Sequence, residues 1–116
     1  MNSIKRNTTP NIVVEIEDVN MDDVTEVRFA FKAINEETAP ELFPEKKYTK
    51  AKNPEHFFKM DDKHFTVNLK LEAEETMKIP KGQVYIDVLP IAGEEILDAG
   101  DPLCFEVRGT YFKEVK

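Results

Sequence analysis

Apolar residues alternate with polar ones in five separate segments of this chain, and this spacing constrains the fold more than any other feature. The segments are residues 12–16, 27–33, 65–71, 84–88 and 103–107. A period of two places successive side chains on opposite faces of an extended strand. Each segment therefore buries one face and exposes the other to water, as do the strands of antiparallel sheets that have one covered side. The pattern predicts an all-β protein.

Weaker segments fit between these strands. Residues 42–48 predict a short edge strand, because a proline such as Pro44 is tolerated at a sheet edge. Residues 56–60 and the strand from Phe65 predict one hairpin, and residues 91–97 predict a second. The stretch 72–77 is the one helical candidate, and it is too short to be stable except as a connector lying over the core.

Together these segments predict an immunoglobulin-like antiparallel β-sandwich of about seven strands with one short helical connector. A small antiparallel barrel has the same periodicity and remains the alternative. The chain has 116 residues, which is the usual length of one domain. We expect a flexible N-terminal tail over residues 1–10 and a single domain over residues 11–116. The predicted core consists of Ile12, Val14, Ile16, Val27, Phe29, Phe31, Phe65, Val67, Leu69, Val84, Ile86, Val88, Phe105 and Val107.

Charge and composition exclude several classes of function. The net charge of −7 repels nucleic-acid phosphates, so we expect no nucleic-acid partner. The single cysteine, Cys104, excludes an internal disulfide framework and a multi-cysteine zinc site. The apolar runs fall far short of the ~20 residues that span a bilayer, and the polar N-terminus has no apolar signal region. We therefore expect a protein made in the cytoplasm that has no membrane contact.

Candidate ligands for a metal are few. His56 and His64 flank the predicted hairpin, and Asp61 or Asp62 in its turn offers a carboxylate, as a small metal-dependent enzyme would need. Surface side chains beside a turn explain these residues more simply. No nucleophile motif or glycine-rich phosphate loop occurs. We therefore predict a protein that is not an enzyme and has no cofactor or metal.

Charged stretches suggest a contact surface. Four lysines surround a tyrosine between residues 46 and 52, and an acidic stretch lies in the helical connector. A lysine-rich edge strand that resists pairing is the simpler explanation of the basic stretch. A head-to-tail contact between the two stretches of different copies is the alternative, and it predicts a monomer or weak homo-oligomer because exposed ion pairs contribute only ~0–1 kcal/mol. The candidate contact residues are Lys46, Lys47, Tyr48, Lys50, Lys52, Glu72, Glu74 and Glu75.

We expect that reversing the charges of the four lysines would weaken association and leave the melting temperature nearly unchanged. Apolar residues on nominally wet faces of the predicted strands point to a partner over part of a sheet. These residues are Val13, Ala30 and Tyr85.

Two short motifs are distinctive. Thr8-Thr9-Pro10-Asn11-Ile12 opens the first strand, and residues 71–76 read Leu-Glu-Ala-Glu-Glu-Thr, which is similar to an L-T-x-E-E-T turn. With the strands at 24–31, 65–69 and 82–88, they resemble a group of small virion-associated proteins of phages and prophages of low-GC Gram-positive bacteria. These proteins are similar to the immunoglobulin-like N-terminal domains of upper baseplate proteins, and the resemblance covers residues 8–111.

The resemblance implies a non-enzymatic structural protein of a phage or prophage, an assembly or adaptor module associated with the tail or baseplate. Its partners would be other virion or tail proteins. It would occupy the bacterial cytoplasm during production and then the virion. A carbohydrate- or adhesin-like binding module is the alternative, and a small metal-dependent enzyme that uses His56 and His64 is a further one.

Overall fold

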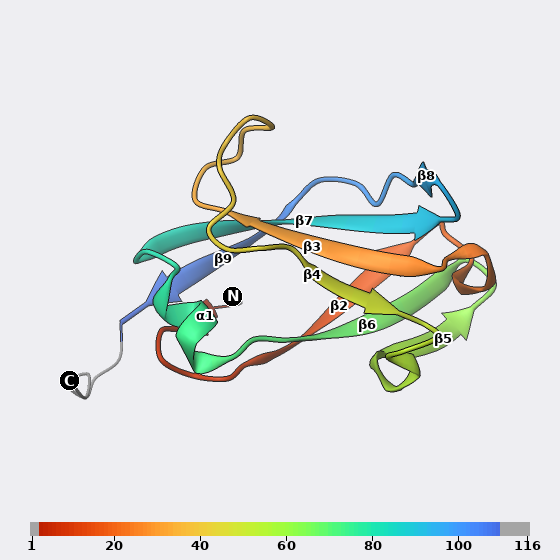
Figure 1. Ribbon diagram of the computed structural model, residues 1–116, viewed down its shortest axis with the longest axis horizontal. Helices are drawn as coiled ribbons and strands as arrows, with labels where there is room; N and C mark the ends of the chain where they lie inside the picture. The colour runs from red at the N-terminus through yellow and green to blue at the C-terminus, as the bar shows by residue number, and fades with distance from the viewer. Residues whose placement is uncertain (1–2, 110–116) are drawn as a thin grey trace.

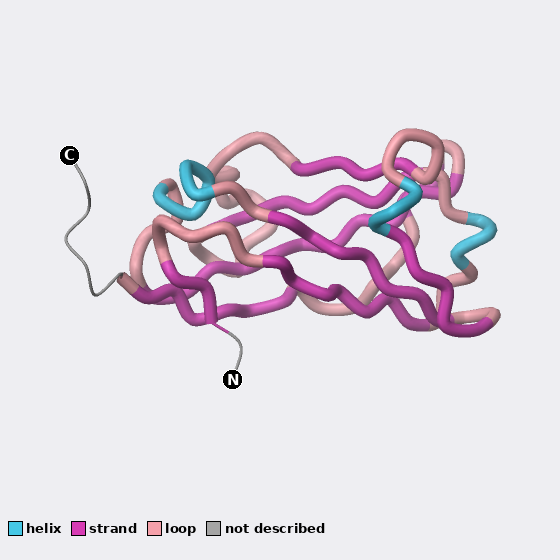
Figure 2. The backbone as a smooth tube through the Cα atoms, turned by 90° about the horizontal axis from the view of Figure 1, so that it is seen from below, coloured by secondary structure: helices cyan, strands magenta, loops and turns pink. Residues whose placement is uncertain are grey.

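The computed structural model describes residues 3–109, which form two β-sheets packed against each other (Figures 1 and 2). The larger sheet has the strand order β1-β9-β7-β3-β4, and β8 pairs with β7. Its strands are β1 (Ser3–Lys5), β3 (Glu26–Lys32), β4 (Lys46–Thr49), β7 (Gly82–Ala92), β8 (Glu95–Ile96) and β9 (Leu103–Arg108). The smaller sheet has the order β2-β6-β5, with β2 (Asn11–Glu17), β5 (Phe57–Asp61) and β6 (His64–Lys70).

Short helical turns connect the two sheets. They are the 3-10 turns η1 (Met21–Asp23) and η2 (Pro54–His56) and the helix α1 (Ala73–Met77), which follows β6. No helix among residues 3–109 is long and apolar enough to cross a membrane.

The strand order is that of an immunoglobulin-like sandwich. Immunoglobulin strands B, E and D form one sheet, while G, F and C form the other, with C′ added beside C in variable-type domains. Strands β2-β6-β5 and β9-β7-β3-β4 follow these orders. The predicted all-β sandwich is therefore confirmed, and the separation into two sheets decides against the small barrel.

The N-terminal segment differs from the prediction. Ser3–Lys5 forms β1, which pairs with β9 in parallel rather than antiparallel, and Ile4 is buried in the core. The expected flexible tail over residues 1–10 therefore does not describe residues 3–10, and the sandwich already includes Ser3. Three residues are too few to show a period. This strand therefore depends on its pairing with β9, which is far away in the sequence.

The predicted core is confirmed with small exceptions. All its members are buried except Ile12 and Val88, which are partly buried and pack against the rest. Ala30, which the alternation placed on the wet face of β3, is also buried. Its methyl group lies on the same face as Arg28 and Lys32, because alternate side chains of a strand share a face.

The predicted connectors also match the structure. The β5–β6 hairpin, the β7–β8 hairpin, the edge strand β4 and the single-turn helix α1 all form where they are expected. Residues 42–44 add no strand of their own, although Glu41 makes an isolated bridge to Lys32. Phe43 instead packs inward, with its ring centroid 4.7 Å from that of Phe31.

Candidate functional site

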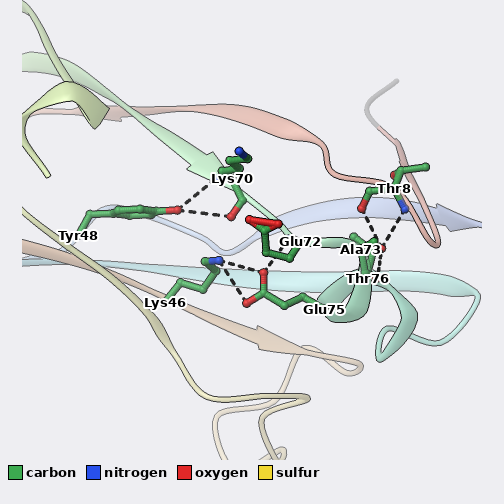
Figure 3. A network of polar contacts seen from close by, with 8 residues as sticks. All are labelled: Thr8, Lys46, Tyr48, Lys70, Glu72, Ala73, Glu75 and Thr76. Atoms are coloured by element: carbon green, nitrogen blue, oxygen red, sulfur yellow. Dashed lines mark hydrogen bonds and ion pairs between the residues drawn. The ribbon is translucent and has the colours of Figure 1, made fainter.

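The two distinctive motifs of the sequence contact each other (Figure 3), beside α1 at one end of the sandwich (Figure 1). The hydroxyl of Thr76 accepts a hydrogen bond from the N–H of Thr8 at 3.3 Å. The same hydroxyl lies 3.1 Å from the carbonyl oxygen of Thr8 and 2.9 Å from that of Ala73, and either can accept its proton. Thr76 is fully buried, so these bonds satisfy a hydroxyl that has no access to water.

Further bonds hold the N-terminal segment to the same turn. The Nη2 of Arg6 donates to the carbonyl oxygen of Met77 at 2.8 Å. The N–H of Leu71 donates to the carbonyl oxygen of Pro10 at 3.0 Å. The segment between β1 and β2 is thus fastened to both ends of the turn that contains α1. We call the bonds between Thr8 and Thr76 the N-terminal clasp.

An ion pair joins the same helix to the edge of the larger sheet. The Nζ of Lys46 on β4 lies 2.9 and 3.2 Å from the two carboxylate oxygens of Glu75 on α1. One of these oxygens also accepts the N–H of Glu72 at 2.8 Å, which is half of a capping box at the start of the helix. The two side chains of the ion pair are only 18% and 21% exposed, so the pair lies largely out of solvent.

Tyr48 links β4 to the smaller sheet. Its hydroxyl accepts the N–H of Lys70 at 3.1 Å and lies 3.4 Å from the carbonyl oxygen of the same residue (Figure 3). Its ring is buried and stacks on His56, with the ring centroids 4.4 Å apart. Tyr48 is therefore a core residue that ties two sheets together.

The candidate contact residues have separate places in this arrangement. Lys46 and Glu75 pair within one chain, Tyr48 is in the core, and the Nζ of Lys50 donates to the carbonyl oxygen of Met21 at 2.6 Å. The sequence suggested an attraction between the basic and acidic stretches of different copies. At Lys46 this attraction instead occurs within one molecule, as the ion pair with Glu75. The candidates whose side chains stay exposed are Lys47, Lys52, Glu72 and Glu74.

This arrangement changes the expected effect of charge changes on stability. We expect Lys46→Met to lower the free energy of unfolding by about 1–2 kcal/mol, because it leaves the Glu75 carboxylate shielded from water without its cation. The matched variant Lys47→Met, at an exposed position of the same strand, is expected to change it by less than about 0.5 kcal/mol. Urea unfolding followed by circular dichroism measures both, and equal midpoints would contradict the assigned role of the ion pair.

The two histidines lie apart. The Nδ1 of His56 donates to the carbonyl oxygen of Asn68 at 2.6 Å, while the Nε2 of His64 lies 3.3 Å from Glu15. The hairpin register separates them, because His56 immediately precedes the start of β5 and His64 pairs with Asp61 at its end. Within the described chain no three His, Cys, Asp or Glu side chains are grouped to hold a metal ion.

The acidic loop after β2 has structural partners. The Asn20 side chain accepts the N–H of Asp22 at 2.9 Å and caps η1. The Nζ of Lys59 on β5 lies 2.9 Å from the Asp22 carboxylate. The hydrogen bond and the charge of Lys59 lower the pKa of Asp22 below its ordinary value, and the same hydrogen bond raises the pKa of Lys59. The pair ties the loop to the smaller sheet.

Exposed apolar side chains lie on the outer face of the smaller sheet. Val13 on β2 is 63% exposed and Phe58 on β5 is 48% exposed. Of the two other candidates for a covered face, Tyr85 is half-buried and Ala30 is buried. Phe58 was not among the residues named from the sequence, although two adjacent phenylalanines in one strand must point to opposite faces.

No protein-family model, curated protein or solved structure matches this chain. The assignment to the immunoglobulin-like class therefore depends on the strand order, and the candidate site depends on the contacts described above.

Proposed function

We propose that this protein is a non-catalytic structural module of a phage or prophage virion, an assembly or adaptor unit of the tail or baseplate. The observation that carries the proposal is the N-terminal clasp between Thr8 and Thr76. These residues belong to the two motifs on which the resemblance to virion-associated proteins depends, and they lie 68 positions apart in the chain. Their direct contact gives the two motifs a common structural purpose.

The clasp suits a module that works by contact. It fixes the segment between β1 and β2 against α1, so the sandwich offers its partners a preorganised surface, and less conformational freedom is lost on binding. Exposed Val13 and Phe58 on the outer face of the smaller sheet supply apolar area of the kind that protein partners cover. The fold by itself carries no function, so the proposal depends on the motifs and their contact.

The proposal predicts where the protein is found. After induction of the source bacterium, we expect the chain to sediment with purified phage particles and to remain after a high-salt wash, together with tail proteins. Mass spectrometry of the gradient fractions measures this, with a cytoplasmic enzyme of the host as the control for contamination. A chain confined to the soluble fraction, while tail proteins sediment, would contradict the proposal. Tail genes beside the coding sequence would be an independent support.

A further inference from the structure

Strand β2 has an open hydrogen-bonding edge. It is the outer strand of the smaller sheet, and no strand within residues 3–109 pairs with its other side. The N–H of Leu71 bonds to the carbonyl oxygen of Pro10, so every second residue from Ile12 onward bonds to β6. The residues between them direct their backbone N–H and C=O groups to the open side. They are Asn11, Val13, Glu15 and Glu17.

The other sheet edges in the described chain are protected. β1 has three residues and β4 has four, and β4 carries the lysines Lys46 and Lys47. β5 has a register shift between Lys59 and Asp61, which interrupts its edge. Short length, lysines and bulges are the devices by which proteins prevent unwanted strand pairing. β2 has seven residues, no register shift and no lysine or proline, so its edge can accept another strand.

The two halves of this edge differ in chemistry. A hollow of about 300 Å³ beside the first half has no charged lining residue, and the apolar side chains of Ile12, Val13 and Phe105 contribute to its wall. A hollow of about 400 Å³ beside the second half is lined by acidic side chains and a short loop. These residues are Glu15, Glu17, Asp18, Asp98, Ala99 and Gly100. A neighbouring hollow adds Asp61, Lys63 and His64, and one lysine leaves the carboxylates in excess.

We propose that β2 is a docking edge for an extended segment of a second protein, which adds to the smaller sheet as a further antiparallel strand. The segment carries Lys or Arg opposite Glu15 and Glu17 and an apolar side chain opposite Val13. Backbone bonds supply the affinity and the alternate side chains supply the specificity. A second copy of this chain does not meet this requirement through β2, because its own acidic strand would bring Glu15 and Glu17 close to the same carboxylates. The proposal does not depend on the virion assignment.

The test uses the full chain labelled with ¹⁵N and the synthetic peptide acetyl-Thr-Lys-Thr-Lys-Thr-Val-Thr-amide. We expect saturable shifts of the amide signals of Asn11, Val13, Glu15 and Glu17. The same peptide with glutamate in place of lysine is expected to produce no shifts. Shifts centred on another strand, or no shifts at all, would overturn the proposal.

Variants separate edge pairing from general charge attraction. Glu15→Lys is expected to weaken peptide binding about tenfold, whereas Glu74→Lys, at an exposed position on α1, is expected to leave it unchanged. Val13→Pro is expected to abolish binding, since it removes an N–H that the fold does not use while proline remains tolerated at an edge. Equal weakening by both charge variants would overturn the proposal. So would concentration-dependent self-association of the peptide-free protein that Val13→Pro abolishes, because a second copy would then occupy β2.

Discussion

Truncation of Phe29 to alanine is expected to lower the free energy of unfolding by about 3–5 kcal/mol, a large part of the stability of the fold. The Phe29 side chain is 0% exposed and lies on β3, between β4 and β7 in the larger sheet. Its ring meets that of Tyr48 edge-on, with the centroids 6.0 Å apart. Removing a buried phenylalanine ring costs about 3–5 kcal/mol, because transfer energy is lost and a cavity remains. Domains of this size are stable by only about 5–15 kcal/mol.

Phe58→Ala is the matched control for this prediction. It makes the same substitution at a side chain that is 48% exposed on β5. We expect it to lower the free energy of unfolding by less than about 1 kcal/mol. Urea unfolding followed by far-ultraviolet circular dichroism compares the two variants with the parent chain. Equal losses of unfolding free energy in the two variants would contradict the difference in burial between Phe29 and Phe58.

Thr76→Val is expected to lower the free energy of unfolding by about 1–3 kcal/mol. Valine has nearly the same shape, so the packing is kept, but the N–H of Thr8 loses its acceptor and the carbonyl of Thr8 or of Ala73 loses its donor. A polar group that is shielded from water and left without a partner costs this much. Hydrogen exchange of the Thr8 amide is expected to become faster, because the N-terminal clasp is lost.

Thr66→Val is the control for the clasp. Thr66 is also a buried threonine, and it lies on β6, where valine suits an extended strand at least as well. We expect it to change the free energy of unfolding by less than about 0.5 kcal/mol and to leave exchange at Thr8 unaltered. If Thr76→Val behaved like Thr66→Val in both measurements, the clasp would contribute nothing and the proposed function would lose its main support.

The strands were predictable because their signal is local. A strand that buries one face shows a period of two in its own sequence, as residues 12–16 and 65–71 do. Ser3–Lys5 has no such signal, since three residues show no period and its place depends on pairing with β9. Ala30 lies on the face that the period predicts and is nevertheless buried, so alternation alone does not decide exposure.

The contacts of the candidate site were predictable only in part. The sequence contains a basic stretch and an acidic stretch, and opposite charges at Lys46 and Glu75 are visible without a structure. The ion pair that they form within one chain could not be predicted from the sequence, since it depends on β4 and α1 lying together at one end of the sandwich. Likewise, the motifs at Thr8 and Thr76 were recognised separately, and only the fold shows that they bond to each other.

By itself, the sequence determined the all-β sandwich and most of its core, because the burial of one strand face is recorded in the spacing of that strand's own residues. Only the tertiary structure decided which charged side chains are paired and which strand edge is open. Lys46 is bound to Glu75, and β2 has β6 on one side and no strand of residues 3–109 on the other, because of the order of the strands in the two sheets. That order is set by contacts between residues far apart in the chain, and no local spacing encodes them.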